Sequence, residues 1–408
     1  MKEQLKKDFF WNTIGSLINS FTSLFFLLII VRINGVEQSG IFTFAFSTAV
    51  LFQIVGMYSG RAFQVTEVSN DIHDSDYIIS RYITCSIMII CGIIFCFTNK
   101  YEIFKIQIML ILLIYKMIEA FSDVLYGIIQ KNNRLYVVGR SLFFKGILGI
   151  FSLLIVDLLT NSLLLASLSL IVVNLLVLLF YDLPNFKNCD YIRSKFNFKI
   201  FKIGFDVFLV TFLTQYLINA PKFAIDNNLS HDYQSIYGII SMPATFMALC
   251  AQFLIHPFLN KIKNHLKTNE YGKINSITIK LSMVMIFIGF FTIIIAYLLG
   301  IPVLQLIYGV KLYDYLLPFM LIITGSVIYG ITIIFQNTLI ALRTTKIQSL
   351  IFIIDSIIAL IFSNYLVRLY SLLGASIMYL ISMLILFILY IVVYIFKMKN
   401  ILKESSYD

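Results

Sequence analysis

Charged side chains are scarce in this chain: only 13% of its 408 residues are Asp, Glu, Lys or Arg, whereas 60% are hydrophobic. A water-soluble protein of this length would need far more polar surface, so the composition excludes that class and indicates a bilayer as the solvent. The net charge of +10 does not indicate nucleic-acid binding, because no basic soluble domain interrupts the apolar sequence.

Catalytic motifs are also missing. The sequence has no GxxxxGK[ST] loop for a nucleotide phosphate, no HExxH among its four histidines and no GxSxG elbow. The five cysteines form no CxxC pair, so neither a metal site nor a disulfide framework is predicted. We therefore expect a protein that is not an enzyme and that has no metal or organic cofactor.

What the sequence does contain is long apolar runs. About 20 residues in a helix cross the hydrocarbon of a bilayer, and a spanning helix satisfies its own backbone hydrogen bonds. The chain is thus predicted to be an all-α polytopic membrane protein with twelve spans. They lie near residues 10–31, 40–61, 80–98, 104–125, 139–158, 162–181, 200–224, 233–257, 276–300, 314–341, 347–367 and 372–396.

The basic residues predict an orientation. With both termini placed in the cytoplasm, about 23 Lys and Arg fall in inner loops and about 6 in outer loops, as the positive-inside rule requires. The basic start, MKEQLKKD, precedes an apolar run without a small-residue cleavage site, so we expect that run to remain as the first span.

The spans divide into six plus six. The predicted domains are an N-terminal six-helix bundle (1–183), a cytoplasmic linker (184–199) and a C-terminal six-helix bundle (200–408). A weak match between SGIFTFAFS, from Ser39, and QSIYGIISM, from Gln234, suggests that the halves are repeats. Parallel six-span repeats are a transporter architecture with the substrate site between the halves.

Charges within the spans are candidate functional groups, because each is costly in hydrocarbon. Lys116, Glu119 and Asp123 share one stripe of the fourth span. Either Lys116 and Glu119 form a buried pair that docks this helix, or they belong to a cation or proton relay. Asp355 is either a protonatable coupling group or a neutral acid at a helix contact. Lys145 is expected to extend back to the headgroups.

The seventh span carries a second constellation. Pro221 removes a backbone donor and tends to kink the helix, and Lys222 and Asp226 follow on one side, a turn apart. Two interpretations remain open. The pair either lies at the outer membrane interface, or it marks a bend of an alternating-access carrier at which a lysine can meet a phosphate.

Two motifs resemble a known family. PKFAID, followed by IYGIISMPATFMALCAQFLIHPFL, is similar to the seventh and eighth spans of Wzx-type polysaccharide flippases. YSGRAFQVTEV, followed by acidic and Ser residues and then YIISRY, resembles the end of their second span and the next loop. These flippases belong to the multidrug/oligosaccharidyl-lipid/polysaccharide (MOP) exporter superfamily, and the twelve-span layout agrees over the whole chain.

The resemblance implies that an undecaprenyl-diphosphate-linked oligosaccharide moves from the inner to the outer leaflet of a bacterial cytoplasmic membrane, for O-antigen or capsule synthesis. It also puts Arg61 and Lys222 on matching motif positions, so we expect them to bind the diphosphate; for Arg61 the ordinary positive-inside role is the alternative. Coupling to H⁺ or Na⁺ is left open, and polymerase and chain-length proteins are candidate partners. Polar and aromatic residues of the spans are the sugar-contact candidates: Asn19, Tyr58, Asn219, Tyr237, Gln252 and Gln336. The alternatives are a small-cation exporter of the MATE type, a lipid II flippase and a membrane-embedded polysaccharide polymerase.

Overall fold

The computed structural model describes residues 2–66, 72–342 and 344–404, and within these ranges it contains helices and no strand. This confirms the all-α fold class predicted from the sequence. Glu67 and Val68, which end one of the quoted motifs, lie outside the described residues.

The chain forms two compact units, Met1–Phe212 and Leu213–Asp408. They divide inside a helix, α8, beyond the predicted linker. The elements of the first unit, in chain order, are α1 (Lys2–Met57), α2 (Gly60–Thr66), α3 (Asp74–Thr98), α4 (Ile103–Lys131), α5 (Leu135–Thr160), α6 (Leu163–Val177), the π-helical turn η1 (Leu178–Asp182), α7 (Leu183–Lys187) and the start of α8 (Lys199–Asn228). The second unit contains the rest of α8, α9 (His231–Lys267), α10 (Tyr271–Ile295), η2 (Ala296–Gly300), α11 (Ile301–Tyr308), η3 (Tyr313–Tyr315), α12 (Leu316–Ala341) and α13 (Thr345–Glu404).

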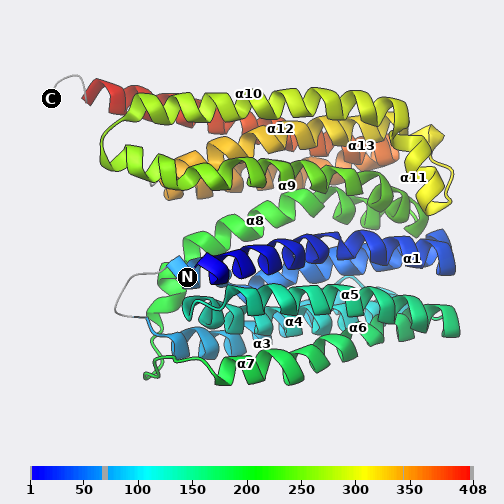
Figure 1. The fold of residues 1–408 in the computed structure, drawn as a ribbon. Helices are drawn as coiled ribbons and strands as arrows, with labels where there is room; N and C mark the ends of the chain where they lie inside the picture. Colours follow the sequence, from blue (N-terminus) through cyan, green and yellow to red (C-terminus); the bar gives the residue numbers. More distant parts are fainter. Residues whose placement is uncertain (1, 67–71, 343, 405–408) are drawn as a thin grey trace. The chain divides into compact units, whose positions relative to one another are not determined.

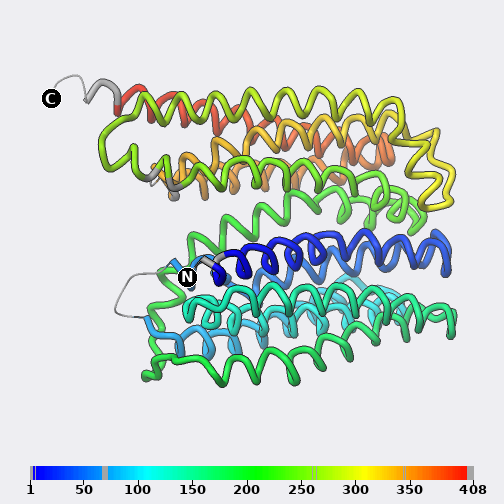
Figure 2. The backbone as a smooth tube through the Cα atoms, in the orientation of Figure 1, coloured from blue at the N-terminus to red at the C-terminus, as the bar shows by residue number. Residues whose placement is uncertain are grey.

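The twelve predicted spans each coincide with a helical segment. Nine helices of the described chain are long and apolar enough to cross a membrane. Two of these, α1 and α13, are 56 and 60 residues long, and each consists of two legs joined at a kink. The twelfth segment is α4, which is 29 residues long but carries too many charges to be counted among the nine. Figures 1 and 2 show α1 turning back so that its legs run side by side.

Each kink is made by a single residue. Gly35 has φ 84° and ψ −179°, and Ser371 has φ 51° and ψ −131°. Glycine adopts such positive φ values without steric cost, whereas serine does not. The predicted outer loop between the first two spans is therefore replaced by a sharp turn at Gly35.

A central helix organises each unit. The apolar stretch of α12 is 72% buried, whereas no other candidate span exceeds 39%. In the second unit α12 packs against α9, α10 and α13. In the first unit α4 packs against α1, α3 and α6. Each of these helices follows three spans of its half, which agrees with the suggested repeat.

In the first unit, α1 and α5 approach each other closely. A Cβ atom added at Gly15 would lie 2.0 Å from the carbonyl oxygen of Gly139. One added at Gly139 would lie 2.3 Å from the backbone of Trp11. The two backbones are thus in direct contact, which small residues allow in membrane helices.

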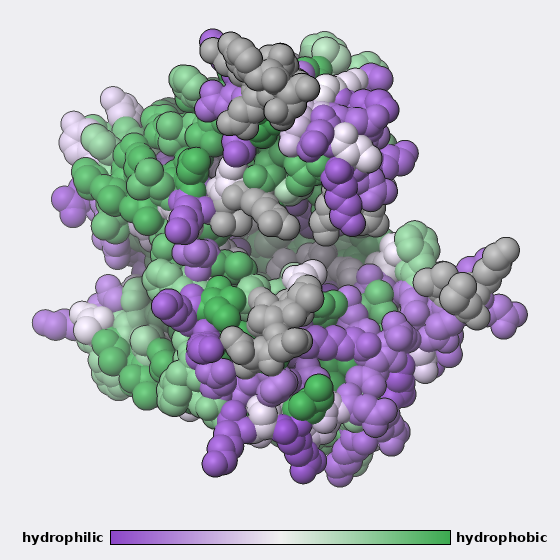
Figure 3. All heavy atoms as spheres, turned by 90° about the vertical axis from the view of Figure 1, so that its left-hand side faces the viewer, coloured by the Kyte–Doolittle hydropathy of each residue, from purple (hydrophilic) through white to green (hydrophobic). Residues whose placement is uncertain are grey.

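The segment between α7 and α8 is held on the first unit by hydrogen bonds. The Asn197 backbone N–H donates to Asp76 Oδ1 (2.9 Å), and the Asn132 amide donates to the Asp190 carbonyl (2.9 Å). Figure 3 shows the side on which this segment lies, and hydrophilic residues gather there. Part of the predicted linker is therefore an ordered component of the first unit.

We predict that Gly139→Leu lowers the thermal unfolding temperature of the purified protein, because the new side chain overlaps the α1 backbone at a cost of about 1–3 kcal/mol. Gly272→Ala is the matched control, because a Cβ there would meet no atom within 4 Å. Equal unfolding temperatures for Gly139→Leu and the wild type would contradict the close approach of α1 and α5.

We predict the opposite effect at the kink of α13. Ser371→Gly should raise the unfolding temperature, because glycine relieves a positive-φ conformation that costs about 1–3 kcal/mol in other residues. Gly35→Ala should lower it for the same reason. Both are measured by thermal denaturation followed by intrinsic fluorescence, and a destabilised Ser371→Gly variant would show that the kink is not strained.

Candidate functional site

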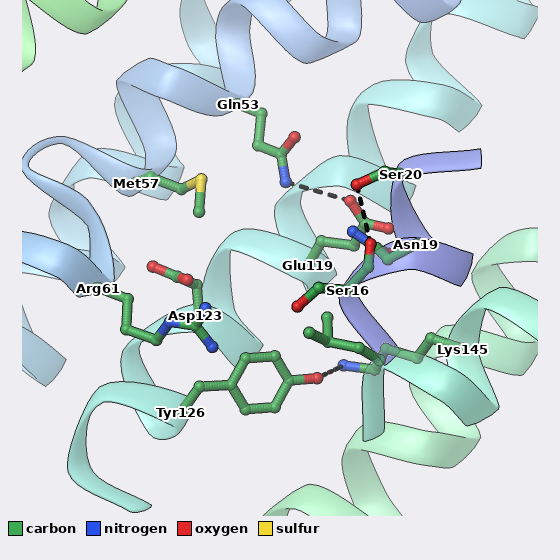
Figure 4. Close-up of a pocket in the computed structure, with 11 residues that line it drawn as sticks. Ser16, Asn19, Ser20, Gln53, Met57, Arg61, Glu119, Asp123, Tyr126 and Lys145 are labelled. Atoms are coloured by element: carbon green, nitrogen blue, oxygen red, sulfur yellow. Dashed lines mark hydrogen bonds between the residues drawn. The ribbon is translucent and has the colours of Figure 1, made fainter. Parts of the chain in front are cut away.

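The first unit contains a polar cavity of about 280 Å³. It lies among α1, α2, α4 and α5, so both legs of α1 contribute to its wall (Figure 4). Its lining residues are Ser16, Asn19, Ser20, Gln53, Met57, Arg61, Glu119, Asp123, Tyr126, Leu142 and Lys145. Most of these side chains are polar or charged, although the surrounding helices are strongly apolar.

The geometry of α1 and α2 explains one side of this cavity. Ser16, Asn19 and Ser20 are three and four residues apart, so they share a face of the first leg of α1. The second leg ends at Met57, where Tyr58 (φ 53°) and Gly60 (φ 69°) break the helix. The short helix α2 then begins and presents Arg61 to the cavity (Figure 4).

Glu119, on α4, also lines the cavity and is paired. Its Oε2 accepts hydrogen bonds from Lys116 Nζ (2.7 Å) and from Gln53 Nε2 (3.2 Å). The contact between Lys116 and Glu119 expected from their spacing is therefore present. The link to Gln53 also ties α4 to the second leg of α1.

Asp123, one turn further along α4, also faces the cavity, although the sequence analysis made nothing of it beyond its place on the stripe. Its Oδ2 lies 3.7 Å from Nη2 of Arg81, on α3, whose side chain is only 4% exposed. Arg81 was not predicted from the sequence, although an arginine at the start of an otherwise apolar third span was a signal for it.

The prediction for Lys145 was wrong, because its ammonium does not extend to the headgroups. It is buried and donates to Asp182 Oδ2 (2.7 Å), Tyr126 Oη (2.9 Å) and Ser122 Oγ (2.5 Å). Asp182 ends the π-helical turn η1, and its side chain is 1% exposed. A buried carboxylate in reach attracts the ammonium more strongly than distant headgroups do. Sequence reasoning placed Asp182 outside the spans and so missed this partner.

The charges around the cavity are balanced in pairs, with one exception. Glu119 is paired with Lys116, Asp123 with Arg81, and Lys145 with Asp182. Within the described part of the chain, no carboxylate lies in ion-pair distance of the Arg61 guanidinium. Counted together, these groups carry one net positive charge, and Arg61 is the cation without an ion-pair partner among the described residues. A cation beside hydroxyl and amide groups is suited to an anion attached to a polar group.

Tyr58, a predicted sugar contact, does not line this cavity. Its hydroxyl donates to the Phe201 carbonyl (2.7 Å), and its ring stacks on Phe208 with centroids 4.8 Å apart. Tyr58 therefore fastens the break after α1 to the beginning of α8. Asn19, by contrast, lines the cavity as expected of a sugar contact.

The remaining predicted residues belong to the second unit. Lys222 and Asp226 are half-buried on α8, which continues as one helix through Pro221. Asn219 and Tyr237 are buried, Gln336 is half-buried and Gln252 is exposed.

Asp355 is fully buried on the first leg of α13, and no cation of the described chain pairs with it.

The two predicted diphosphate ligands, Arg61 and Lys222, lie in different units.

Known proteins resemble this chain in sequence and in fold, although no family model matches it. The capsular polysaccharide biosynthesis protein CapF of Staphylococcus aureus is 25% identical over 395 residues, which cover 94% of this chain and 98% of that protein. The chain resembles an inward-facing multidrug-resistance MATE transporter of the MOP superfamily with a TM-score of 0.70, at 12% identity over 97% of this chain and 99% of the other.

The lipid II flippase MurJ, in an inward closed conformation, is also similar, with a TM-score of 0.67. It is 15% identical, and the match covers 93% of this chain and 86% of that protein. At such identities the solved structures establish the fold, while CapF supplies a relative in sequence. The chain therefore has the fold of the MOP-superfamily transporters, and its resemblance to the polysaccharide flippases of that superfamily is confirmed.

Proposed function

We propose that this protein moves a polyprenyl-diphosphate-linked oligosaccharide from the inner to the outer leaflet of a bacterial cytoplasmic membrane, for a capsule or another surface polysaccharide. One observation carries the proposal: in the polar cavity of the first unit, Arg61 lies among hydroxyl and amide groups, and no carboxylate of the described residues is within ion-pair distance of it. The name of the relative CapF, a capsular polysaccharide biosynthesis protein, supports the same pathway.

The physical problem of such a substrate is its headgroup. A diphosphate carries negative charge that is very costly to bury unless a cation and hydrogen-bond donors replace its water. Arg61 supplies a planar, permanently charged donor, and Asn19, Ser16 and Ser20 supply polar contacts for the attached sugar. The prenyl chain remains in the lipid, and Lys222 receives the diphosphate at a later stage of transport.

The charge pairing also weighs against a MATE-type exporter of organic cations. Glu119 and Asp123 would attract such a cation, but Lys116 and Arg81 already pair with them. Deletion of the gene should accordingly lower surface polysaccharide and leave susceptibility to cationic drugs unchanged. If the protein were instead a polymerase, the purified protein would lengthen glycans in liposomes.

We predict that Arg61→Ala lowers surface polysaccharide by at least about tenfold at matched protein levels, because a lost charge-assisted contact to a phosphate is worth more than about 1.4 kcal/mol. Arg61→Lys should retain part of the activity, since it keeps the charge without the planar fork. Lys222→Ala should also reduce export. Wild-type polysaccharide from the Arg61→Ala and Lys222→Ala variants would overturn the proposed roles.

Asp355 is our candidate for coupling transport to protons. Burial without a cation disfavours the charged form of a carboxyl group, and a change of surroundings such as an alternating-access transition provides can reverse this preference. We predict that Asp355→Asn lowers surface polysaccharide about tenfold and that Asp355→Glu retains activity. The neighbouring substitution Ser356→Ala is the control. Normal export by Asp355→Asn would exclude this residue from coupling.

A further inference from the structure

The backbone carbonyl group of Gly56 lies just before the break that leads to α2 and Arg61. It lies in the last turn of α1, where the helix breaks, so its backbone oxygen depends on donors from outside the helix. Two side chains of α3 supply them: Arg81 Nη1 donates at 2.8 Å and Thr84 Oγ1 at 2.6 Å. Both side chains are buried, so the broken end of α1 is fixed to α3.

The other end of the segment is fixed to α4. Gln64, on α2, is fully buried, and its amide donates to the Val124 carbonyl (3.2 Å). A Cβ atom at Gly127 would lie 2.1 Å from the Gln64 amide oxygen, so the glycine makes room for this contact. Arg61 is therefore carried by a short segment that is held on both sides.

Arg81 also forms an ion pair. Its Nη2 lies 3.7 Å from Asp123 Oδ2, and Asp123 lines the cavity together with Arg61 (Figure 4). The Asp123 carboxylate also lies beside Arg61 in the wall of the same cavity. Without Arg81, the buried carboxylate would be left with Arg61 as its nearest strong counter-charge.

We propose that Arg81 is a positioning residue for Arg61: it caps the broken end of α1 and occupies Asp123, so that the Arg61 guanidinium stays available to an anionic ligand in the cavity. Arg81 itself does not line the cavity and acts only through Gly56 and Asp123. This inference rests on the proposed role of Arg61 in binding the diphosphate.

The test is a second-site rescue, measured as surface polysaccharide in a deletion strain at matched membrane levels of each variant. Arg81→Met should reduce export by at least about tenfold, because Asp123 then neutralises Arg61. The double variant Arg81→Met/Asp123→Asn should regain most of the export, because the competing carboxylate is gone. The double variant also removes the unpaired buried carboxylate that Arg81→Met leaves, so the unfolding temperature of each variant is measured as well. A purely structural role predicts that export rises and falls with the unfolding temperature, whereas the positioning role predicts that export is lost even at an unfolding temperature at which a control variant exports normally.

Two further variants complete the set. Thr84→Val removes only one of the two donors to Gly56, so a smaller loss is expected. Arg134→Met is the matched control, because Arg134 also donates to a backbone carbonyl, that of Asn185 (3.2 Å), but does not line the cavity. It should export normally.

The outcomes separate the two hypotheses. Normal export by Arg81→Met, or a double variant no better than Arg81→Met, overturns the positioning role while leaving the proposed function intact, provided that Arg61→Ala is deficient. Normal export by Arg61→Ala contradicts the proposed role of Arg61 itself. Deficient Arg61→Ala and Arg81→Met, with recovery in the double variant, supports both.

Discussion

The cost of a bare charge in a low-dielectric interior governs the first unit. Each buried carboxylate at the cavity is matched by a cation from another turn or another helix: Glu119 by Lys116, Asp123 by Arg81, and Asp182 by Lys145. A buried pair contributes little net stability, but loss of one partner leaves an expensive unpaired charge. The pairs therefore fix how α3, α4, α5 and η1 meet, and this arrangement leaves Arg61 as the charge that a ligand can use.

Irregular backbone supplies the rest of the site. The break between α1 and α2 turns Arg61 toward the cavity, and the π-helical turn η1 carries Asp182 to Lys145. Non-helical backbone inside a membrane protein requires partners for its carbonyl groups, and Arg81 and Thr84 provide them at Gly56. Arg81 thus both satisfies the backbone at Gly56 and pairs with Asp123. A single substitution of Arg81 removes both contacts, whereas the double variant with Asp123→Asn tests the pairing.

The fold was largely predictable, because apolar run length and the bilayer thickness together determine where helices form. Sequence spacing also predicted the pair Lys116–Glu119, since residues three apart share a helix face. It could not predict Lys145–Asp182 or Arg81–Asp123, because those pairs join different helices and depend on which faces meet. The kinks at Gly35 and Ser371 were expected as loops, since a turn of one residue leaves almost no compositional signal.

The central claim is that Arg61 in the first unit's cavity is needed to carry a diphosphate headgroup across the membrane. Its most direct test uses purified protein in liposomes that contain a fluorescent polyprenyl-diphosphate sugar, with the movement of the probe followed by a membrane-impermeant quencher. We expect that wild-type protein transfers the probe between leaflets and that Arg61→Ala protein, inserted in equal amount, does not. Equal transfer rates for the two proteins would contradict it.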